Sequence, residues 1–279
     1  LEPAMRNTAP CIAYANYKIA EKNPNGNIVV APADHLILKE DEFVKVVNMA
    51  LAFTENNDCL VTLGITPSRP DTGYGYIQFD TNASANGEIK KVKTFTEKPN
   101  QELALNFLDS GDFLWNSGMF IWSAKSITLA YRKHLRDMYE VFDEGKQFYN
   151  TINEKEFIDR VFPACKNISI DYGIMEKSEN VYVYPADFGW SDLGTWNSAC
   201  DNMEKDYFGN AVVGKNVMVV DANNCMVHAP DKKLVLLQGL RDYIIVDTED
   251  TLLICKKDKE QQIKEYVAEV KRNKGDKYI

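Results

Sequence analysis

The chain of 279 residues is 45% hydrophobic and 26% charged, with a formal net charge of −9 at pH 7 and a sequence pI near 5.0. This composition predicts a globular protein with one large domain, or one domain and a small appendage. Because affinity for nucleic acids and anionic membranes depends mostly on concentrated Lys and Arg, the acidic balance argues against both kinds of partner. No apolar run approaches the roughly 20 residues that span a bilayer, and no signal-peptide pattern opens the chain, so we expect a cytoplasmic protein.

The cysteines are scattered, without a C-x-x-C pair or a neighbouring set of histidines. We therefore expect no zinc site, and we interpret most of the cysteines as small buried side chains in a reducing compartment. They stand at positions 11, 59, 165, 200, 225 and 255.

Helices and strands alternate in the first quarter of the chain. Asn7 or Thr8 can cap a first helix, which the run NPNGN ends before a strand that begins at Ile28. A second helix fits residues 40–57, and a strand follows at 59–65. This β–α–β order favours a parallel sheet with right-handed crossovers.

The middle of the chain predicts a mixture of strands and helices. Residues 73–79 and 89–99 have the pattern of two strands joined by the turn-rich run DTNASANGE, and residues 114–122 that of another strand. A helical cluster follows within residues 126–162, before a further strand at 180–186.

From about residue 210 the pattern changes to short strands separated by turn signals, and one helix closes the chain. We interpret this tail as a small β-rich appendage. The predicted fold class is α/β, a Rossmann-like sheet with helices on both faces, divided into a domain of residues 1–208 and a tail of residues 209–279.

Two predicted strand ends carry an aspartate: Asp34 in PADH and Asp192 in GWSD. Carboxylates at the carboxyl ends of strands face the crevice where open α/β sheets bind ligands. Two of them that converge can hold Mg²⁺, which also takes oxygens from a phosphorylated substrate. Asp also starts turns and caps helices, and residue chemistry alone favours that simpler role.

Several other residues have chemistry that suits a sugar phosphate. Lys98 in TEKP can offer a charge to a phosphate and Glu97 can accept from sugar hydroxyls, although such pairs are often only solvated strand ends. Gly75 lets a ligand approach the backbone, or it marks a bulge. Asn116 in WNSG can both donate to and accept from a hydroxyl, or it can be a satisfied turn residue.

Each of these patterns is weak alone, but their order along the chain is specific. In sequence, the chain reads EPAMRNTAP, PADH, TLGITPSRPDTGYGYI, FTEKP, WNSGMFIW, SIDYGIMEKSENVYVYP and FGWSDLGTW. With these blocks it closely resembles the mannose-1-phosphate guanylyltransferases over nearly its whole length. The resemblance implies an enzyme that transfers a nucleotidyl group from GTP to mannose 1-phosphate.

The resemblance also implies roles for individual positions. Asp34 and Asp192 would hold Mg²⁺, and Lys98 would act with them in catalysis by offsetting the charge of the attacking phosphate. The substrate contacts would come from the remaining matched positions: Glu97, Gly75 and Asn116 on the sugar, Asn7 and Thr8 on the nucleotide side, and Asp171 and Lys177 near the same pocket.

The implied reaction is an in-line attack of a phosphate oxygen of mannose 1-phosphate on the α-phosphorus of GTP, with pyrophosphate as the leaving group. It needs mainly alignment and charge neutralisation. A phosphate monoester is already anionic near pH 7, so His35 is not needed as a base and we interpret it as structural.

In one respect the sequence departs from the family. Its members begin with a strand and a glycine-rich loop that carries Arg and Lys, and nothing of this kind precedes Leu1. We therefore expect the chain as printed to bind GTP weakly, to turn over poorly, and to associate as a homo-oligomer, most simply a dimer. Because no cupin-type domain follows the last helix, isomerase activity is not expected. Two alternatives stay open: transfer to another sugar or from another nucleotide, and a non-catalytic subunit that regulates or scaffolds a complete one.

Overall fold

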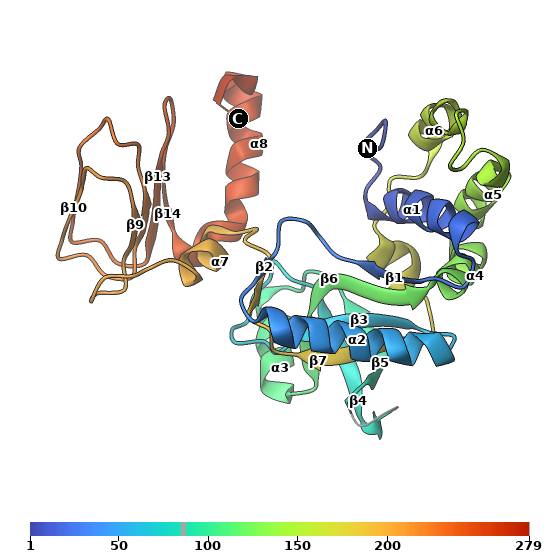
Figure 1. Ribbon diagram of the computed structural model, residues 1–279. Helices are drawn as coiled ribbons and strands as arrows, with labels where there is room; N and C mark the ends of the chain where they lie inside the picture. Colours follow the sequence, from blue (N-terminus) through green and yellow to red (C-terminus); the bar gives the residue numbers. More distant parts are fainter. Residues whose placement is uncertain (85–87, 279) are drawn as a thin grey trace. The chain divides into compact units, whose positions relative to one another are not determined.

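The computed structural model describes residues 1–84 and 88–278, and the chain divides into two compact units (Figure 1). The N-terminal unit consists of Leu1–Ala33 and Ile37–Trp190, and the C-terminal unit of Asp34–Leu36 and Ser191–Ile279. Part of the turn predicted in DTNASANGE lies outside the described residues. Within them, no helix has the length and apolar character needed to cross a membrane.

The N-terminal unit is built on a six-stranded sheet in the order β1-β6-β3-β7-β5-β4, and a further pairing of β4 with β6 closes it on itself. A bulge between Thr62 and Gly64 lets β3 bend there, and a Cβ at Gly64 would lie 2.6 Å from Val183 Cγ2. The strands are β1 (Asn27–Val30), β3 (Leu60–Ile65), β4 (Tyr76–Ser84), β5 (Lys90–Thr96), β6 (Phe113–Ser123) and β7 (Val181–Ala186), while β2 (Leu36–Ile37) and β8 (Trp190–Ser191) form a separate pair.

The prediction of a parallel sheet is wrong for most of these neighbours. Among the described residues of this six-stranded sheet, only β3 and β7 pair in parallel, whereas β6 pairs antiparallel with β1, β3 and β4. The β–α–β pattern correctly indicates that β1 and β3 run in the same direction, since both oppose β6. What local sequence could not show is that the later strand β6 inserts between them.

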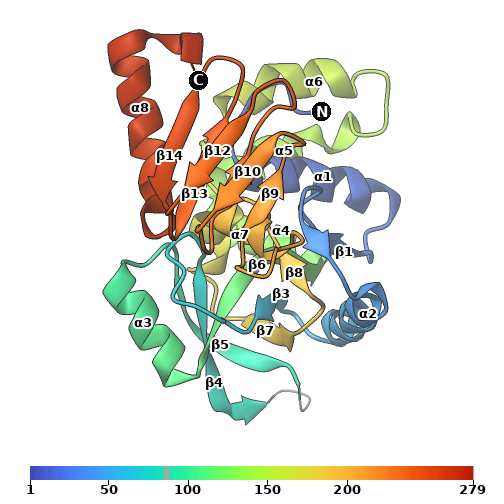
Figure 2. The ribbon, with the colours of Figure 1, turned by 90° about the vertical axis from the view of Figure 1, so that its left-hand side faces the viewer.

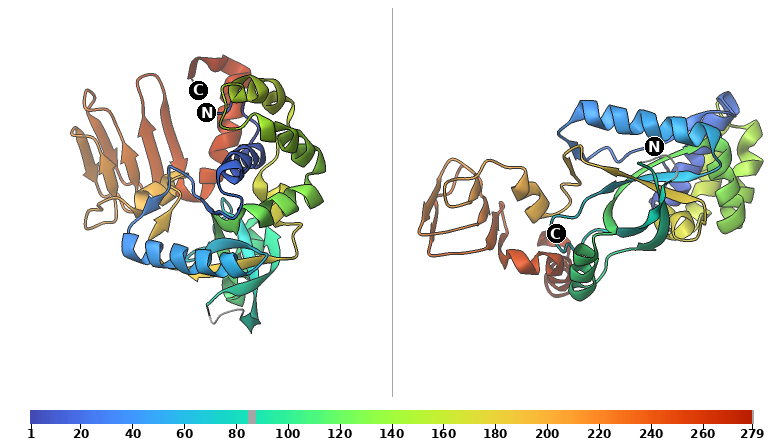
Figure 3. Two further views of the ribbon diagram at one scale, coloured as in Figure 1. Left: turned by 45° about the vertical axis from the view of Figure 1, so that its right-hand side comes forward. Right: turned by 90° about the horizontal axis from the view of Figure 1, so that it is seen from below.

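Helices cover both faces of this sheet, as the alternation of side chains along β6 shows. Phe120 and Trp122 join the core under α1 (Thr8–Lys22), α4 (Ala124–His134), α5 (Arg136–Glu144) and α6 (Glu154–Val161). Met119 and Ile121 join the core under α2 (Glu40–Asn56), which lies along the sheet in Figure 3. Shorter helical turns are η1 (Gly145–Gln147), η2 (Phe162–Ala164) and the π-helical η3 (Asp171–Met175).

Local signals account for the ends of several helices. Asn7 caps α1 as predicted, since its side chain accepts from Thr8 N. The helix α3 (Gln101–Ser110) was not predicted, although both of its end signals are present: Asn100 accepts from Leu103 N, and Gly111 at its end has a left-handed φ of 73°.

The C-terminal unit consists of two small sheets, ordered β14-β13-β11-β9 and β10-β12 (Figure 2). Neighbours pair in parallel except for β13 with β14, and Val217, Val219 and Val235 pack between the two sheets against Val227 and Ile245. The elements are α7 (Trp196–Asp201), β9 (Ala211–Val213), β10 (Val217–Val220), β11 (Met226–His228), β12 (Val235–Gln238), β13 (Tyr243–Asp247), β14 (Leu252–Lys256), η4 (Lys257–Gln262), α8 (Ile263–Lys274) and η5 (Asp276–Tyr278).

Candidate functional site

The end of β5 and the start of β4 bring Glu97 against Gly75. An added Cβ at Gly75 would lie 2.3 Å from Glu97 Oε2 and 3.5 Å from Asn116 Cβ. The backbone of Gly75 also accepts a hydrogen bond from Asn116 N at 2.8 Å. Three residues that the sequence predicts as sugar contacts are therefore neighbours, and the Glu97 carboxylate occupies the space that a Cβ at position 75 would take.

Asn116 connects this group to Asp171. Its Nδ2 donates to Asp171 Oδ1 at 2.7 Å, and its Oδ1 accepts from Gly118 N at 3.3 Å. The hydroxyl of the buried Thr62 lies 3.2 Å from Asn116 Oδ1, which fixes the orientation of the amide. Asn116 is thus held from two strands with its amide nitrogen facing a carboxylate.

Burial and like charge perturb the acids of this group. Burial raises the pKa of Asp171, the charge of Glu97 adds to this effect, and the bond from Asn116 opposes it. Burial also raises the pKa of Glu176, again with Glu97 and Asp171 as contributing charges. Perturbed acids close together are typical of binding and catalytic sites.

Lys98 supplies the positive charge of the group. Its Nζ lies 2.5 Å from Glu97 Oε1, and this hydrogen bond raises the pKa of Lys98. The Lys98 backbone has a left-handed φ of 48°, a conformation that costs a non-glycine residue about 1 to 3 kcal/mol and is enriched at functional sites. The lysine side chain is about half exposed, so its charge is accessible to a ligand.

The segment before Asp171 contacts the start of α1. Thr8 Oγ1 accepts a hydrogen bond from Ile170 N at 2.8 Å, and Ala9 N donates to Ile168 O at 3.1 Å. Asn7 Oδ1 accepts from Thr8 N at 2.9 Å. Asn7 and Thr8, the two predicted nucleotide contacts, therefore each make a structural hydrogen bond. Asn7 caps α1, and Thr8 holds the segment that leads to Asp171.

Lys177 is less closely associated with the group. It lies just past η3, is exposed, and its charge lowers the pKa of His134, although burial and Lys133 contribute more. It also acts on the neighbouring Glu176, whose pKa it lowers against the stronger effect of burial. Within the described interactions, no contact joins Lys177 to Asn116 or Glu97.

Asp34 and Asp192 both belong to the C-terminal unit. Burial lowers the pKa of the His35 imidazole, and the charges of Asp34 and Asp192 both oppose this shift, so the two carboxylates lie near the same ring. Asp192 Oδ1 accepts from Gly194 N at 3.0 Å, and Asp34 is exposed in a turn.

These two acids suit a hard divalent cation that takes its other ligands from elsewhere. Among the residues that the structure describes, no cluster of three or more His, Cys, Asp or Glu side chains could hold a metal ion. Mg²⁺ is commonly bound through one or two carboxylates, with water and substrate phosphates completing its coordination. The donor chemistry of Asp34 and Asp192 fits this arrangement.

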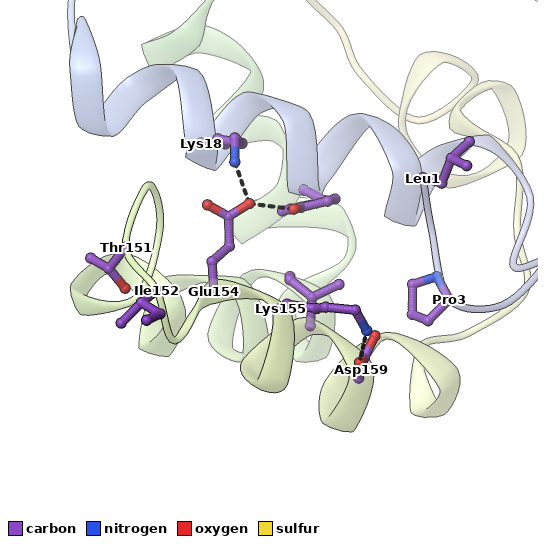
Figure 4. Close-up of a pocket in the computed structure, with 10 residues that line it drawn as sticks. Leu1, Pro3, Lys18, Thr151, Ile152, Glu154, Lys155 and Asp159 are labelled. Atoms are coloured by element: carbon purple, nitrogen blue, oxygen red, sulfur yellow. Dashed lines mark hydrogen bonds and ion pairs between the residues drawn. The ribbon is translucent and has the colours of Figure 1, made fainter.

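A hollow of about 490 Å³ between α1 and α6 is lined by none of these residues (Figure 4). Its polar centre is the buried Glu154, which accepts from Tyr14 Oη and Lys18 Nζ on α1 and from Asn150 N at 2.6 Å. The donors satisfy both oxygens of the carboxylate, so we interpret Glu154 as a structural link between α1 and α6.

Thr62 and Glu176, which contact or act on this group, were not among the residues that the sequence predicts. Glu176 N donates to Asp171 O at 2.9 Å, the i to i+5 bond of a π-helix, and this wide turn brings Glu176 back towards Asp171. An α-helical spacing would not place positions 171 and 176 on one face. The proximity of Glu176 to Asp171 could therefore not be predicted from the sequence, because it depends on this π-helical turn.

Comparison with known proteins places the chain in a family. The model of the nucleotidyl transferase family matches residues 1–207, and that of the MannoseP isomerase/GMP-like beta-helix domain matches residues 215–270. The chain belongs to the nucleotidyl transferase family, with a mixed α/β nucleotidyltransferase fold and a C-terminal β-helix-like domain. The predicted resemblance is thus confirmed at the level of the family.

Curated relatives match almost the whole chain. Alginate biosynthesis protein AlgA of Pseudomonas aeruginosa is 36% identical over 97% of this chain and 56% of its own length. Mannose-1-phosphate guanylyltransferase of Salmonella montevideo is 37% identical over 100% of this chain and 59% of its own length. The Escherichia coli protein of the same name is 35% identical over 96% of this chain and 58% of its own length. The chain therefore spans little more than half the length of the curated relatives that it matches.

Solved structures agree with this assignment. A chain described as mannose-1-phosphate geranyltransferase from Thermus thermophilus superposes with a TM-score of 0.82 at 28% identity, over 97% of this chain and 77% of its own. A chain described as mannose-6-phosphate isomerase from Helicobacter pylori gives a TM-score of 0.56 at 27% identity, over 68% of this chain and 72% of its own.

Proposed function

We propose that this protein transfers a guanylyl group from GTP to mannose 1-phosphate and releases pyrophosphate. The observation that carries the proposal is the group of Gly75, Glu97, Asn116 and Asp171, in which carboxylate and amide side chains that can bind sugar hydroxyls lie together. Two curated relatives at 35% and 37% identity are mannose-1-phosphate guanylyltransferases, which supports this choice of substrates.

In this proposal each residue has one task. Glu97 and Asn116 bind hydroxyls of the sugar and orient its phosphate, while Lys98 lies beside that phosphate and offsets its charge as it meets the triphosphate. Asp171 orients Asn116, and Thr8 holds the segment from which Asp171 projects. The nucleotide contacts of Asn7 and Thr8 and a contact from Lys177 remain predictions.

We further propose that Asp34 and Asp192 hold Mg²⁺. When bound, the cation would draw charge from the α-phosphate and favour attack on its phosphorus. The two carboxylates would supply the protein ligands and keep the cation near His35. Together with Lys98 they make the proposed catalytic set. Association as a homo-oligomer remains a prediction, which light scattering tests.

Pyrophosphate release tests the reaction. The protein is incubated with Mg²⁺ and each of GTP, ATP, UTP and CTP, paired with mannose 1-phosphate or glucose 1-phosphate. The proposal requires the GTP and mannose 1-phosphate pair to give the highest kcat/KM. A higher value with another pair would establish the alternative of a different base or sugar.

Binding measured by calorimetry separates the enzyme from the non-catalytic alternative. A regulatory or scaffolding subunit would bind GDP-mannose without releasing pyrophosphate from any pair. In the enzyme, Glu97→Gln should weaken mannose 1-phosphate binding, and Asp34→Asn and Asp192→Asn should each weaken the binding of Mn²⁺ used as a probe for Mg²⁺.

A further inference from the structure

The loop that carries Asp192 runs directly into α7. The first turn of this helix is bonded to Glu260, which lies 63 positions after Asn197 in the chain. Glu260 Oε1 accepts a hydrogen bond from Asn197 N at 2.9 Å. Glu260 lies in η4 and is only 9% exposed. A carboxylate that accepts from the free N–H groups at a helix start stabilises that end of the helix. The start of α7 is therefore held by the chain segment that follows β14.

The same segment holds α7 at a second point. Asn197 Nδ2 donates to Lys257 O at 3.3 Å, while Lys257 Nζ lies 3.5 Å from Cys200 Sγ and 3.0 Å from Asn224 Oδ1. Cys200 is buried with Met226 among strand residues of the C-terminal unit. Because α7 is attached to η4 at both ends and packed on the strands, the direction of its first turn is fixed.

From that first turn, hydrogen bonds continue back to Asp192. Thr195 Oγ1 accepts from Ser198 N at 3.1 Å, which caps α7, and Gly194 N donates to Asp192 Oδ1 at 3.0 Å. A Cβ at Gly194 would lie 2.7 Å from Asp192 Oδ2, so the carboxylate is turned back against this backbone. The position of the Asp192 carboxylate thus depends on where α7 begins.

One side of this loop borders a hollow. A hollow of about 340 Å³ lies beside it, lined by Leu193, Gly194, Trp196, Ala199, Glu260 and Ile263. Leu193 is 42% exposed and has a left-handed φ of 50°. The hydrogen bonds at the α7 end of the loop therefore contribute to its restraint on the side of this hollow.

We propose that Glu260 is a positioning residue that sets the Asp192 carboxylate for cation binding, through its bond to Asn197 N and the first turn of α7. This inference rests on the proposed metal role of Asp192. It gives the β-helix-like part of the chain an indirect role in cation binding, through the position of Asp192.

The test compares two Glu260 variants that separate the oxygen from the charge. Glu260→Gln keeps an oxygen at the same reach but removes the charge, whereas Glu260→Asp keeps the charge but shortens the side chain by one methylene. Asp258→Asn is the matched control, since it removes a charge from an exposed position of the same segment. Mn²⁺ binding is followed by the EPR signal of the free ion, and amide exchange of residues 193–197 by mass spectrometry.

Glu260→Asp should weaken Mn²⁺ binding about tenfold, the size expected when one hydrogen bond to a charged group is lost, and should speed exchange of residues 193–197. Glu260→Gln and Asp258→Asn should both behave as the unchanged protein. If Glu260→Gln instead binds Mn²⁺ more weakly than Glu260→Asp does, the charge of Glu260 matters and the reach of its oxygen does not. That result would overturn the proposal.

Asp192→Asn separates a failure of the Glu260 positioning role from a failure of the proposed metal site. If it abolishes Mn²⁺ binding while Glu260→Asp leaves the affinity unchanged, only the positioning role is overturned. If Asp192→Asn itself leaves Mn²⁺ binding intact, the proposed metal site is wrong and the positioning role is overturned with it.

Discussion

The carboxylate of Glu97 lies so close to Gly75 that a Cβ at position 75 would stand 2.3 Å from Glu97 Oε2. This oxygen is the far end of a flexible side chain, so Gly75→Ala should displace the carboxylate and cost little stability. Losing one hydrogen bond to a charged group costs about 1.5 to 3 kcal/mol, roughly ten- to a hundredfold in affinity. We therefore expect Gly75→Ala to weaken mannose 1-phosphate binding in calorimetry by about ten- to a hundredfold, with a nearly unchanged melting temperature.

Gly111→Ala is the control for this prediction. Its φ of 73° makes alanine strained there, but nothing lies within 4 Å of the added Cβ. It should lower the melting temperature and leave sugar phosphate affinity as it was. Equal affinities for the two variants would contradict the contact between Gly75 and Glu97 as a binding feature.

Lys98→Met should weaken mannose 1-phosphate binding by about tenfold or more, because a hydrogen bond to a charged group typically contributes about 1.5 to 3 kcal/mol. The loss should be greatest at low salt, where the charge of a half-exposed lysine is least screened. Calorimetry at two ionic strengths measures both effects. Lys93→Met is the control, since Lys93 lies on β5, the strand that leads to Lys98, with Asp80 3.6 Å away. Similar losses in the two variants would rule out a specific role for Lys98.

Asp171→Asn should stabilise the protein at neutral pH. Burial, together with the charge of Glu97, raises the pKa of Asp171 above its ordinary value of 3.8. A raised carboxyl pKa means that the folded state binds the proton more tightly, so stability is lost as pH rises through that pKa. Asparagine removes this penalty and can still accept from Asn116.

The melting temperature of Asp171→Asn should therefore exceed that of the unchanged protein at pH 7, and the difference should shrink as pH falls towards 3.8. Asp112→Asn should show the opposite sign at pH 7, because the hydrogen bond from Gln78 lowers the pKa of Asp112. A lower melting temperature for Asp171→Asn at pH 7 would contradict the argument.

Glu154→Gln should destabilise the link between α1 and α6 (Figure 4). Burial raises the pKa of Glu154, but hydrogen bonds from Lys18, Tyr14 and Asn150 outweigh it and hold the pKa below the ordinary value of 4.5. The glutamine amide would face one of these donors, at a cost of about 1 to 3 kcal/mol near pH 7.

Because the pKa of Glu154 is lowered, its contribution is fully present above pH 4.5 and is lost as pH falls through the folded-state pKa. Thermal melts of Glu154→Gln and the unchanged protein should therefore converge in acid. Glu156→Gln, at an exposed position of the same helix, is the control and should show no such convergence. A difference that grows below pH 4.5 would exclude an ionised Glu154 as the link.

Much of the secondary structure could be predicted because its signals are local. Asn7 marks the start of α1, and the apolar face of residues 40–57 marks α2. Sheet order could not be predicted in this way, since the insertion of β6 between β1 and β3 depends on contacts between distant segments. The same limit hid Glu176, which a π-helical turn brings towards Asp171.

The sequence by itself determined the family and the residues to suspect, because the order of short blocks along the chain is far more specific than any single motif. Only the tertiary structure decided how these residues act on one another. It set Glu97 against Gly75, turned Asn116 towards Asp171 and placed Glu260 at the start of α7. Such relationships depend on packing in three dimensions, and no pattern of neighbouring residues encodes them.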